Sequence, residues 1–121
     1  MDDCVFCKIV KKETPAKIEL ETADFLVFKD KFPNATIHLL IVPKKHILDI
    51  TQATDDDWKE IKDIALKIAK DKTVNSFRLV HNAADAAYIK HMHVHFLGGV
   101  TVERKVWLLK LLLNKSARRW R

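Results

Sequence analysis

The amino-acid sequence predicts an α+β domain that combines several antiparallel strands with one long helix. Short apolar runs bounded by turn-forming residues, such as 25–28 and 37–42, have the composition of strands. Residues 54–70 instead carry apolar side chains at helical spacing. In residues 91–97 histidines alternate with apolar residues, as in a strand with one chemical face and one core face.

The first half of the chain predicts a short helix and three strands. Apolar pairs at near-helical spacing indicate a helix over residues 4–10, which the break at Thr14-Pro15 follows. Residues 18–20 and 25–28 read as strands on either side of a turn. A loop then leads to a central strand over 37–42, which Pro43 ends.

The second half of the chain contains the clearest helix. Thr54 and Asp57 have the spacing of a capping box, and the apolar stripe that begins at Trp58 is assigned to the core. A strand over 77–80, a loop over 82–90 and the histidine strand over 91–97 complete the domain.

Size and composition predict one soluble, cytoplasmic domain. The 121 residues suffice for a modest core, and two glycines and three prolines leave little room for disordered linkers. Neither a signal-peptide core nor a run of membrane-spanning length is present. Both cysteines lie in Cys4-Val5-Phe6-Cys7, so they cannot join distant parts of the fold, and a reducing compartment is expected.

The net charge of +6 resides in the C-terminal residues. Residues 101–121 hold seven of the 22 basic side chains and one of the 16 acidic ones. We therefore predict a domain over residues 1–100 and a basic amphipathic, helical extension over residues 101–121. This extension is expected to pack on the domain or across a dimer, and contact with a membrane surface or a nucleic-acid backbone is the alternative.

Three imidazoles on one strand face serve either metal binding or nucleophilic chemistry. Gly98-Gly99, directly after the strand, allows close backbone approach and favours the nucleophile. The stretch His91-Met92-His93-Val94-His95-Phe96-Leu97-Gly98-Gly99 resembles the signature of the histidine-triad (HIT) family, closest to its Hint-like branch. This resemblance covers residues 4–99 and implies the HIT fold, a mainly antiparallel five-stranded sheet with one long helix and a short N-terminal helix. It also implies a purine-nucleotide substrate and a homodimer.

The resemblance assigns the catalytic residues. His93, the middle histidine, matches the residue that attacks the α-phosphorus and forms a covalent nucleotidyl-histidine, which water then cleaves. His95 is expected to stabilise the phosphoryl oxygens, and His38 matches a fourth imidazole of the family. We expect the His93 imidazole to be partly exposed on its strand.

The nucleoside end of the substrate is expected beside residues 25–33, which resemble the family's nucleoside-binding strand and loop. Asp30 would bind the ribose, Asn82 matches a binding residue of the family's loop, and the base would be bordered by Phe28, Lys29, Lys31 and Thr14. The loop 82–90 departs from the family pattern because it contains no glycine and has Ala87 where glutamine is usual. Lys90 or Tyr88 is the expected substitute phosphate donor.

Cys4 and Cys7 have the spacing of half a tetrahedral zinc site, which two imidazoles can complete. By resemblance to the zinc-binding subset of the family, these imidazoles are His46 and His91, and the zinc is structural. The alternative is a pair of reduced cysteines beside the core.

Two functions follow. The first is a purine nucleoside phosphoramidase or related nucleotidyl hydrolase. The alternative is a zinc-stabilised nucleotide- or partner-binding module with weak or no catalysis.

Overall fold

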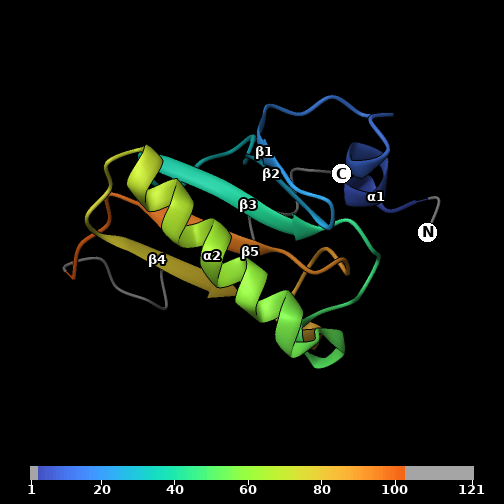
Figure 1. Cartoon of the computed structure of the whole chain (residues 1–121). Coiled ribbons are helices and arrows are strands. Elements are labelled where there is room, and N and C mark those ends of the chain that lie inside the picture. The colour runs from blue at the N-terminus through green and yellow to red at the C-terminus, as the bar shows by residue number, and fades with distance from the viewer. Residues whose placement is uncertain (1–2, 103–121) are drawn as a thin grey trace.

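The computed structural model describes residues 3–102 and shows the α+β architecture that the resemblance implies (Figure 1). Its five strands form one antiparallel sheet in the order β1-β2-β3-β5-β4. The predicted C-terminal helical extension lies outside the described residues, apart from residues 101 and 102. In chain order the elements are α1 (Val5–Val10), β1 (Ile18–Glu21), β2 (Phe25–Lys29), β3 (Ile37–Pro43), α2 (Asp55–Asp71), β4 (Phe77–His81) and β5 (Val94–Gly98), with 3-10 turns at Ile50–Gln52 and Ala84–Ala86.

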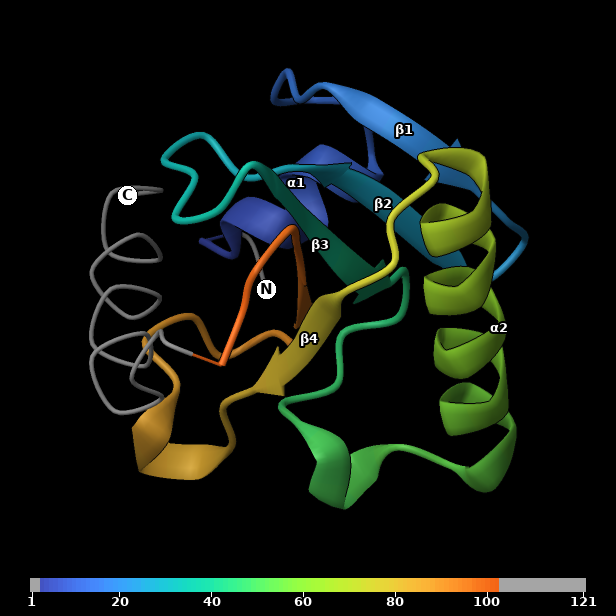
Figure 2. The same ribbon diagram turned by 90° about the vertical axis from the view of Figure 1, so that its left-hand side faces the viewer.

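The sheet lies between α1 and α2, so it has a separate core on each face (Figure 2). On one face Ile61, Ile64 and Ile68 of α2 pack against alternate residues of β2, β3 and β5. On the other face Phe6 and Ile9 of α1 pack against the intervening strand residues. No helix within residues 3–102 is long and apolar enough to cross a membrane.

The predicted capping box of α2 is confirmed. The Asp57 amide donates to Thr54 Oγ1 at 3.1 Å, and the Thr54 amide donates to Asp57 Oδ2 at 2.8 Å. These two bonds satisfy amide groups that the first helical turn leaves without carbonyl partners. Trp58 is partly buried against the core, as its place in the apolar stripe predicts.

The predicted start of the histidine strand is wrong. β5 begins at Val94, three residues later than expected. The backbone before it bonds elsewhere: the Met92 amide donates to the Ile47 carbonyl at 2.8 Å. His91 therefore precedes the ladder, but the predicted alternation of side chains is confirmed. Met92, Val94 and Phe96 pack in the core beside α2. His91 and His93 contact Phe6 of α1 on the other face, and His95 contacts His93.

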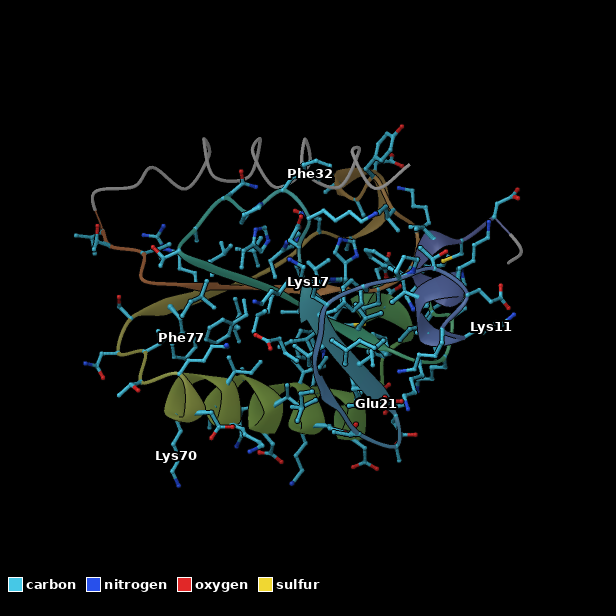
Figure 3. All side chains as sticks on the ribbon, turned by 90° about the horizontal axis from the view of Figure 1, so that it is seen from above. Lys11, Lys17, Glu21, Phe32, Lys70 and Phe77 are labelled. Carbon is cyan, nitrogen blue, oxygen red and sulfur yellow. The ribbon has the colours of Figure 1, made fainter. Side chains whose placement is uncertain are left out.

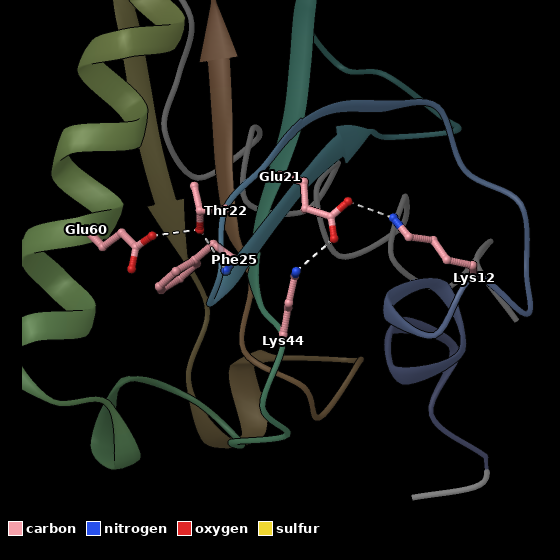
Figure 4. Close-up of polar contacts among 6 residues, drawn as sticks. All are labelled: Lys12, Glu21, Thr22, Phe25, Lys44 and Glu60. Atoms are coloured by element: carbon pink, nitrogen blue, oxygen red, sulfur yellow. Dashed lines mark hydrogen bonds and ion pairs between the residues drawn. The ribbon is translucent and has the colours of Figure 1, made fainter.

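Ion pairs connect the end of β1 to the segment that follows α1 and to the segment that follows β3 (Figure 4). Glu21 accepts hydrogen bonds from Lys44 at 2.7 Å and from Lys12 at 2.9 Å. These bonds lower the pKa of Glu21 to about 2, so it is ionised at neutral pH. In the turn between β1 and β2, the Thr22 hydroxyl donates to the carboxylate of Glu60 on α2 at 2.7 Å.

Candidate active site

Antiparallel pairing of β3 with β5 brings His38 and His95 together. The two side chains meet through His38 Nε2 and His95 Nδ1, which are 2.9 Å apart. The Asn34 amide donates to His38 Nδ1 at 3.1 Å, so His38 carries its proton on Nε2 and donates it to His95. His95 must then carry its own proton on Nε2. That buried nitrogen has no hydrogen-bond partner among residues 3–102, so it is a donor available to a ligand.

His93 is held with a nitrogen lone pair available for attack. Its Nδ1–H donates to the His91 carbonyl at 2.8 Å, which leaves Nε2 unprotonated. The imidazole lies edge-on to Phe6, with ring centroids 5.1 Å apart. Contrary to expectation, His93 is buried, with 3% of its surface exposed, because α1 covers this part of the sheet.

Burial keeps these histidines neutral. It lowers the pKa of His93 to about 4, although the hydrogen bond to the His91 carbonyl opposes this effect. The pKa of His95 is well below its usual value for the same reason, and the neighbouring His93 lowers it further. Burial also lowers the pKa of His38, against the opposing charge of Asp30. At neutral pH the site therefore combines an unprotonated imidazole nitrogen, on His93, with a neutral N–H donor, on His95.

Asp30 joins this histidine pair to a cavity. Its Oδ2 lies 3.4 Å from His38 Nε2, and its Oδ1 accepts from the Phe32 amide at 2.9 Å. A cavity of about 610 Å³ opens at Asp30. Its lining contains the predicted residues Lys29 and Lys31, together with Pro15, Ala16, Lys17 and Pro33.

The other predicted substrate-binding residues lie apart from that cavity. Phe28 is fully buried and meets Phe6 edge-on at 5.6 Å, so it belongs to the core. Thr14 lines a second cavity of about 540 Å³, together with Lys8, Ile89 and Lys90. Asn82 is buried, and its Oδ1 has no hydrogen-bond partner within the described part of the chain.

The four predicted metal ligands Cys4, Cys7, His46 and His91 converge, with their donor atoms within 4.8 Å of one another. Cys7 Sγ lies 3.1 Å from His46 Nδ1 and 3.5 Å from His91 Nδ1. The two Nδ1 atoms are 3.2 Å apart, and Cys4 Sγ is 3.4 Å from His91 Nδ1. The edges of a tetrahedron around zinc measure about 3.3 to 3.8 Å for such ligands. The cluster can therefore hold a metal ion.

Two further features fit a cation at this cluster. His91 Nε2–H donates to the Pro43 carbonyl at 2.8 Å, which directs the Nδ1 lone pair at the cysteines. Burial and the neighbouring Cys4 raise the pKa of the Cys7 thiol to about 11, so a thiolate there requires a compensating positive charge.

A second close group, Asp30, His38 and His95, does not suit a metal ion. His38 Nδ1 accepts the Asn34 amide, so Nε2 must keep its proton. Metal binding at Nε2 would turn this imidazole into an anion.

One histidine of the site was not predicted. His81, the last residue of β4, donates from Nδ1 to the His93 carbonyl at 3.0 Å and accepts the Ile50 amide at Nε2, also at 3.0 Å. It thereby holds the backbone of His93 from the neighbouring strand. Only the pairing of β4 with β5 places it there, and its isolated position in the sequence carries no motif.

Comparisons with known proteins agree with this architecture. A family model described as "Scavenger mRNA decapping enzyme C-term binding" matches residues 3–105. An uncharacterized HIT-like protein from Synechocystis is 38% identical over 104 residues, which cover 81% of this chain and 91% of that protein. A HIT family hydrolase structure from Clostridium thermocellum is 35% identical with a TM-score of 0.78, and the match covers 88% of this chain and 98% of that one. A zinc-bound histidine triad family protein from Mycobacterium smegmatis has the same fold, with 23% identity, a TM-score of 0.74, and coverage of 98% of this chain and 95% of that one.

Proposed function

Because this chain belongs to the histidine-triad (HIT) family, we propose that it hydrolyses a purine nucleoside phosphoramidate or a related nucleotidyl bond, as Hint-like proteins do. The observation that carries this proposal is the pair of tautomers at the site. His93 has an unprotonated Nε2, and His95 has a buried N–H without a protein partner in residues 3–102. HIT family hydrolases among the similar structures support a hydrolytic reaction.

The proposed reaction has two steps. His93 Nε2 attacks the α-phosphorus, the bond from phosphorus to the leaving amine breaks, and the amine takes up a proton from solvent, which the water of the second step returns. Water then attacks the nucleotidyl-histidine, which releases a nucleoside monophosphate and restores the neutral imidazole. In both steps His95 Nε2–H donates to a phosphoryl oxygen as its negative charge develops. Asp30 binds the ribose beside the cavity that Lys29 and Lys31 line.

The alternative is a nucleotide- or partner-binding module, because the loop 82–90 lacks glycine. Incubation with adenosine 5′-phosphoramidate separates the two functions through the release of ammonia. We expect turnover. Micromolar binding of adenosine monophosphate without turnover would instead establish the binding module.

We further propose that the chain forms a homodimer through the free edge of β4. Within residues 3–102, β4 pairs only with β5, and 43% of the surface of Leu79 on β4 is exposed. An exposed edge strand presents unpaired backbone groups to another chain. Sedimentation velocity at micromolar concentration is expected to show a dimer, and a monomer would contradict the proposal.

We predict one zinc ion per chain, bound by Cys4, Cys7, His46 and His91. Four protein ligands make a closed structural site, which needs a reducing compartment to keep both cysteines as thiols. Removal of the metal by a chelator is expected to lower Tm by roughly 10 °C. Activity should fall as well, because His91 also orients His93 through its carbonyl. Elemental analysis and thermal unfolding test this prediction, and His46→Ala should reproduce both losses. A zinc-free protein with unchanged Tm in chelator would contradict it.

The site also predicts an unusual pH dependence. The folded pKa of His93 is about 4, below its ordinary value of 6.5, so His93 should remain an active nucleophile well below pH 6.5. The unfolded chain binds a proton near pH 6.5, whereas the folded chain binds it only near pH 4. The contribution of His93 to the free energy of unfolding is therefore fully present above pH 6.5 and is lost as the pH falls toward 4. The pH profile of kcat/KM and Tm between pH 4 and 8 test both effects. Activity that falls to half its maximum at pH 6.5 would contradict the prediction that His93 stays active below that pH.

A further inference from the structure

Residues 82–90 form the loop that follows β4 (Figure 2). One of its residues, Ala84, has an unfavourable backbone conformation. Ala84 begins the 3-10 turn Ala84–Ala86 with a φ of 51°. The left-handed region is disfavoured for a residue with a Cβ atom, and glycine is the usual residue there. Contacts from outside the turn must therefore stabilise it.

Two charged side chains hold Ala84 from opposite sides. Its amide donates to Asp49 Oδ2 at 2.9 Å, and its carbonyl accepts from Lys90 Nζ. The same ammonium also donates to the Ala87 carbonyl at 2.7 Å, so Lys90 spans the turn. Such charge-assisted hydrogen bonds are stronger than neutral ones.

Asp49 is itself fixed. Its Oδ1 accepts from the amide of Thr51 at 2.8 Å and from the Thr51 hydroxyl at 2.5 Å. Hydrogen bonds from Thr51 and from the Ala84 amide lower the pKa of Asp49, which keeps it ionised. Ala84 is thus bound between a rigid carboxylate and an ammonium.

Both ends of this loop adjoin residues that bond to His93: Asn82 follows His81, and Lys90 precedes His91. Asn82, at one end, is buried with an amide oxygen that has no partner in the described residues. Lys90, at the other end, directly precedes His91, whose carbonyl fixes the tautomer of His93. Ile89 packs in the same core cluster as Phe6, which contacts His93. A shift of the Ala84 turn would therefore disturb residues that contact His93.

We propose that Asp49 and Lys90 are positioning residues that clamp the Ala84 turn and thereby place Asn82 and the His91 carbonyl for catalysis at His93. This inference rests on the proposed nucleotidyl-hydrolase function. It gives Lys90 a role different from the phosphate donor expected from the sequence, because two of its three ammonium donors bind loop carbonyls.

Replacement of Lys90 by methionine tests the clamp in the full-length, metal-loaded protein. With adenosine 5′-phosphoramidate, we expect kcat of K90M to fall roughly tenfold or more, because small displacements in an active site are costly. KM should change less than kcat, and K90R should recover part of the loss. The control is K70M, which removes the same charge from an exposed position on α2, where Lys70 points away from the domain (Figure 3). Its kcat and KM should match the wild type.

A glycine at position 84 tests whether the clamp works through the backbone of Ala84. Glycine adopts a positive φ without the penalty of a Cβ atom, so an A84G background should depend less on Lys90. We expect K90M to lose less activity in A84G than in the wild-type background. An equal loss in both backgrounds would overturn the proposal, and so would wild-type kcat in K90M.

Amide hydrogen exchange provides a readout independent of activity. The amides of Ala84, Ala86 and Ala87 should exchange faster in K90M, while those of α2 and β5 keep wild-type rates. If K90M unfolds globally, D49N provides the same test, because it keeps the side-chain shape and removes the charge. Unchanged loop exchange in the folded variant would overturn the clamp. If the wild type lacks turnover but K90M loosens the loop, the proposed function fails and the clamp stands.

Discussion

Replacement of His93 by alanine is expected to abolish turnover and formation of the covalent intermediate. Loss of a catalytic nucleophile lowers kcat by on the order of a thousandfold or more. His93 is the triad residue whose Nδ1–H is fixed by a backbone carbonyl, so its Nε2 is directed to attack phosphorus. The measurement is intact mass after a rapid, acid-free quench with a nucleotidyl donor. Wild-type protein should gain the mass of one nucleoside monophosphate, and H93A should not.

Folding must be checked separately in this variant because His93 is buried against Phe6. Truncation of a buried side chain leaves a cavity and lowers stability. H93N is the matched variant, since its amide can still donate to the His91 carbonyl but cannot form the adduct. Both variants should keep micromolar nucleotide binding. Equal turnover by H93N and wild type would refute the covalent mechanism.

Replacement of His95 by alanine is expected to lower kcat by about 100- to 1,000-fold, as loss of one oxyanion donor commonly does. Its Nε2–H is buried and has no partner in residues 3–102, so a substrate phosphoryl oxygen is the group that it can bind. The nucleotidyl-His93 adduct should still form in H95A, but more slowly. Single-turnover kinetics measure this difference.

His38 provides the comparison for His95. His38 donates to His95 Nδ1 at 2.9 Å and thereby fixes its tautomer. It acts through His95, so H38A should lose less activity than H95A. A larger loss in H38A, or an unchanged rate in H95A, would show that phosphoryl stabilisation comes from another group.

Local sequence patterns were sufficient for most of the fold. The capping box of Thr54 and Asp57 and the apolar stripe after it define α2, because helix formation depends on residues three and four apart. Short apolar runs between turn residues located four strands to within one residue at either end, and the alternation of histidines with apolar residues located the fifth to within three. The spacing of Cys4 and Cys7, and the resemblance that added His46 and His91, identified a cluster that converges in space.

Only the tertiary structure decided the protonation state of the triad histidines. The tautomers of His93 and His95 depend on carbonyls, amides and imidazoles that the sheet order brings together. The role of His81 depends on the register between β4 and β5, and the burial of His93 depends on where α1 covers the sheet. The start of β5 was set by the bond from Met92 to Ile47 and not by strand propensity. Such contacts join residues that are distant in the chain. A local pattern therefore indicates which residues are present, and packing determines which ring nitrogen of each histidine carries the proton.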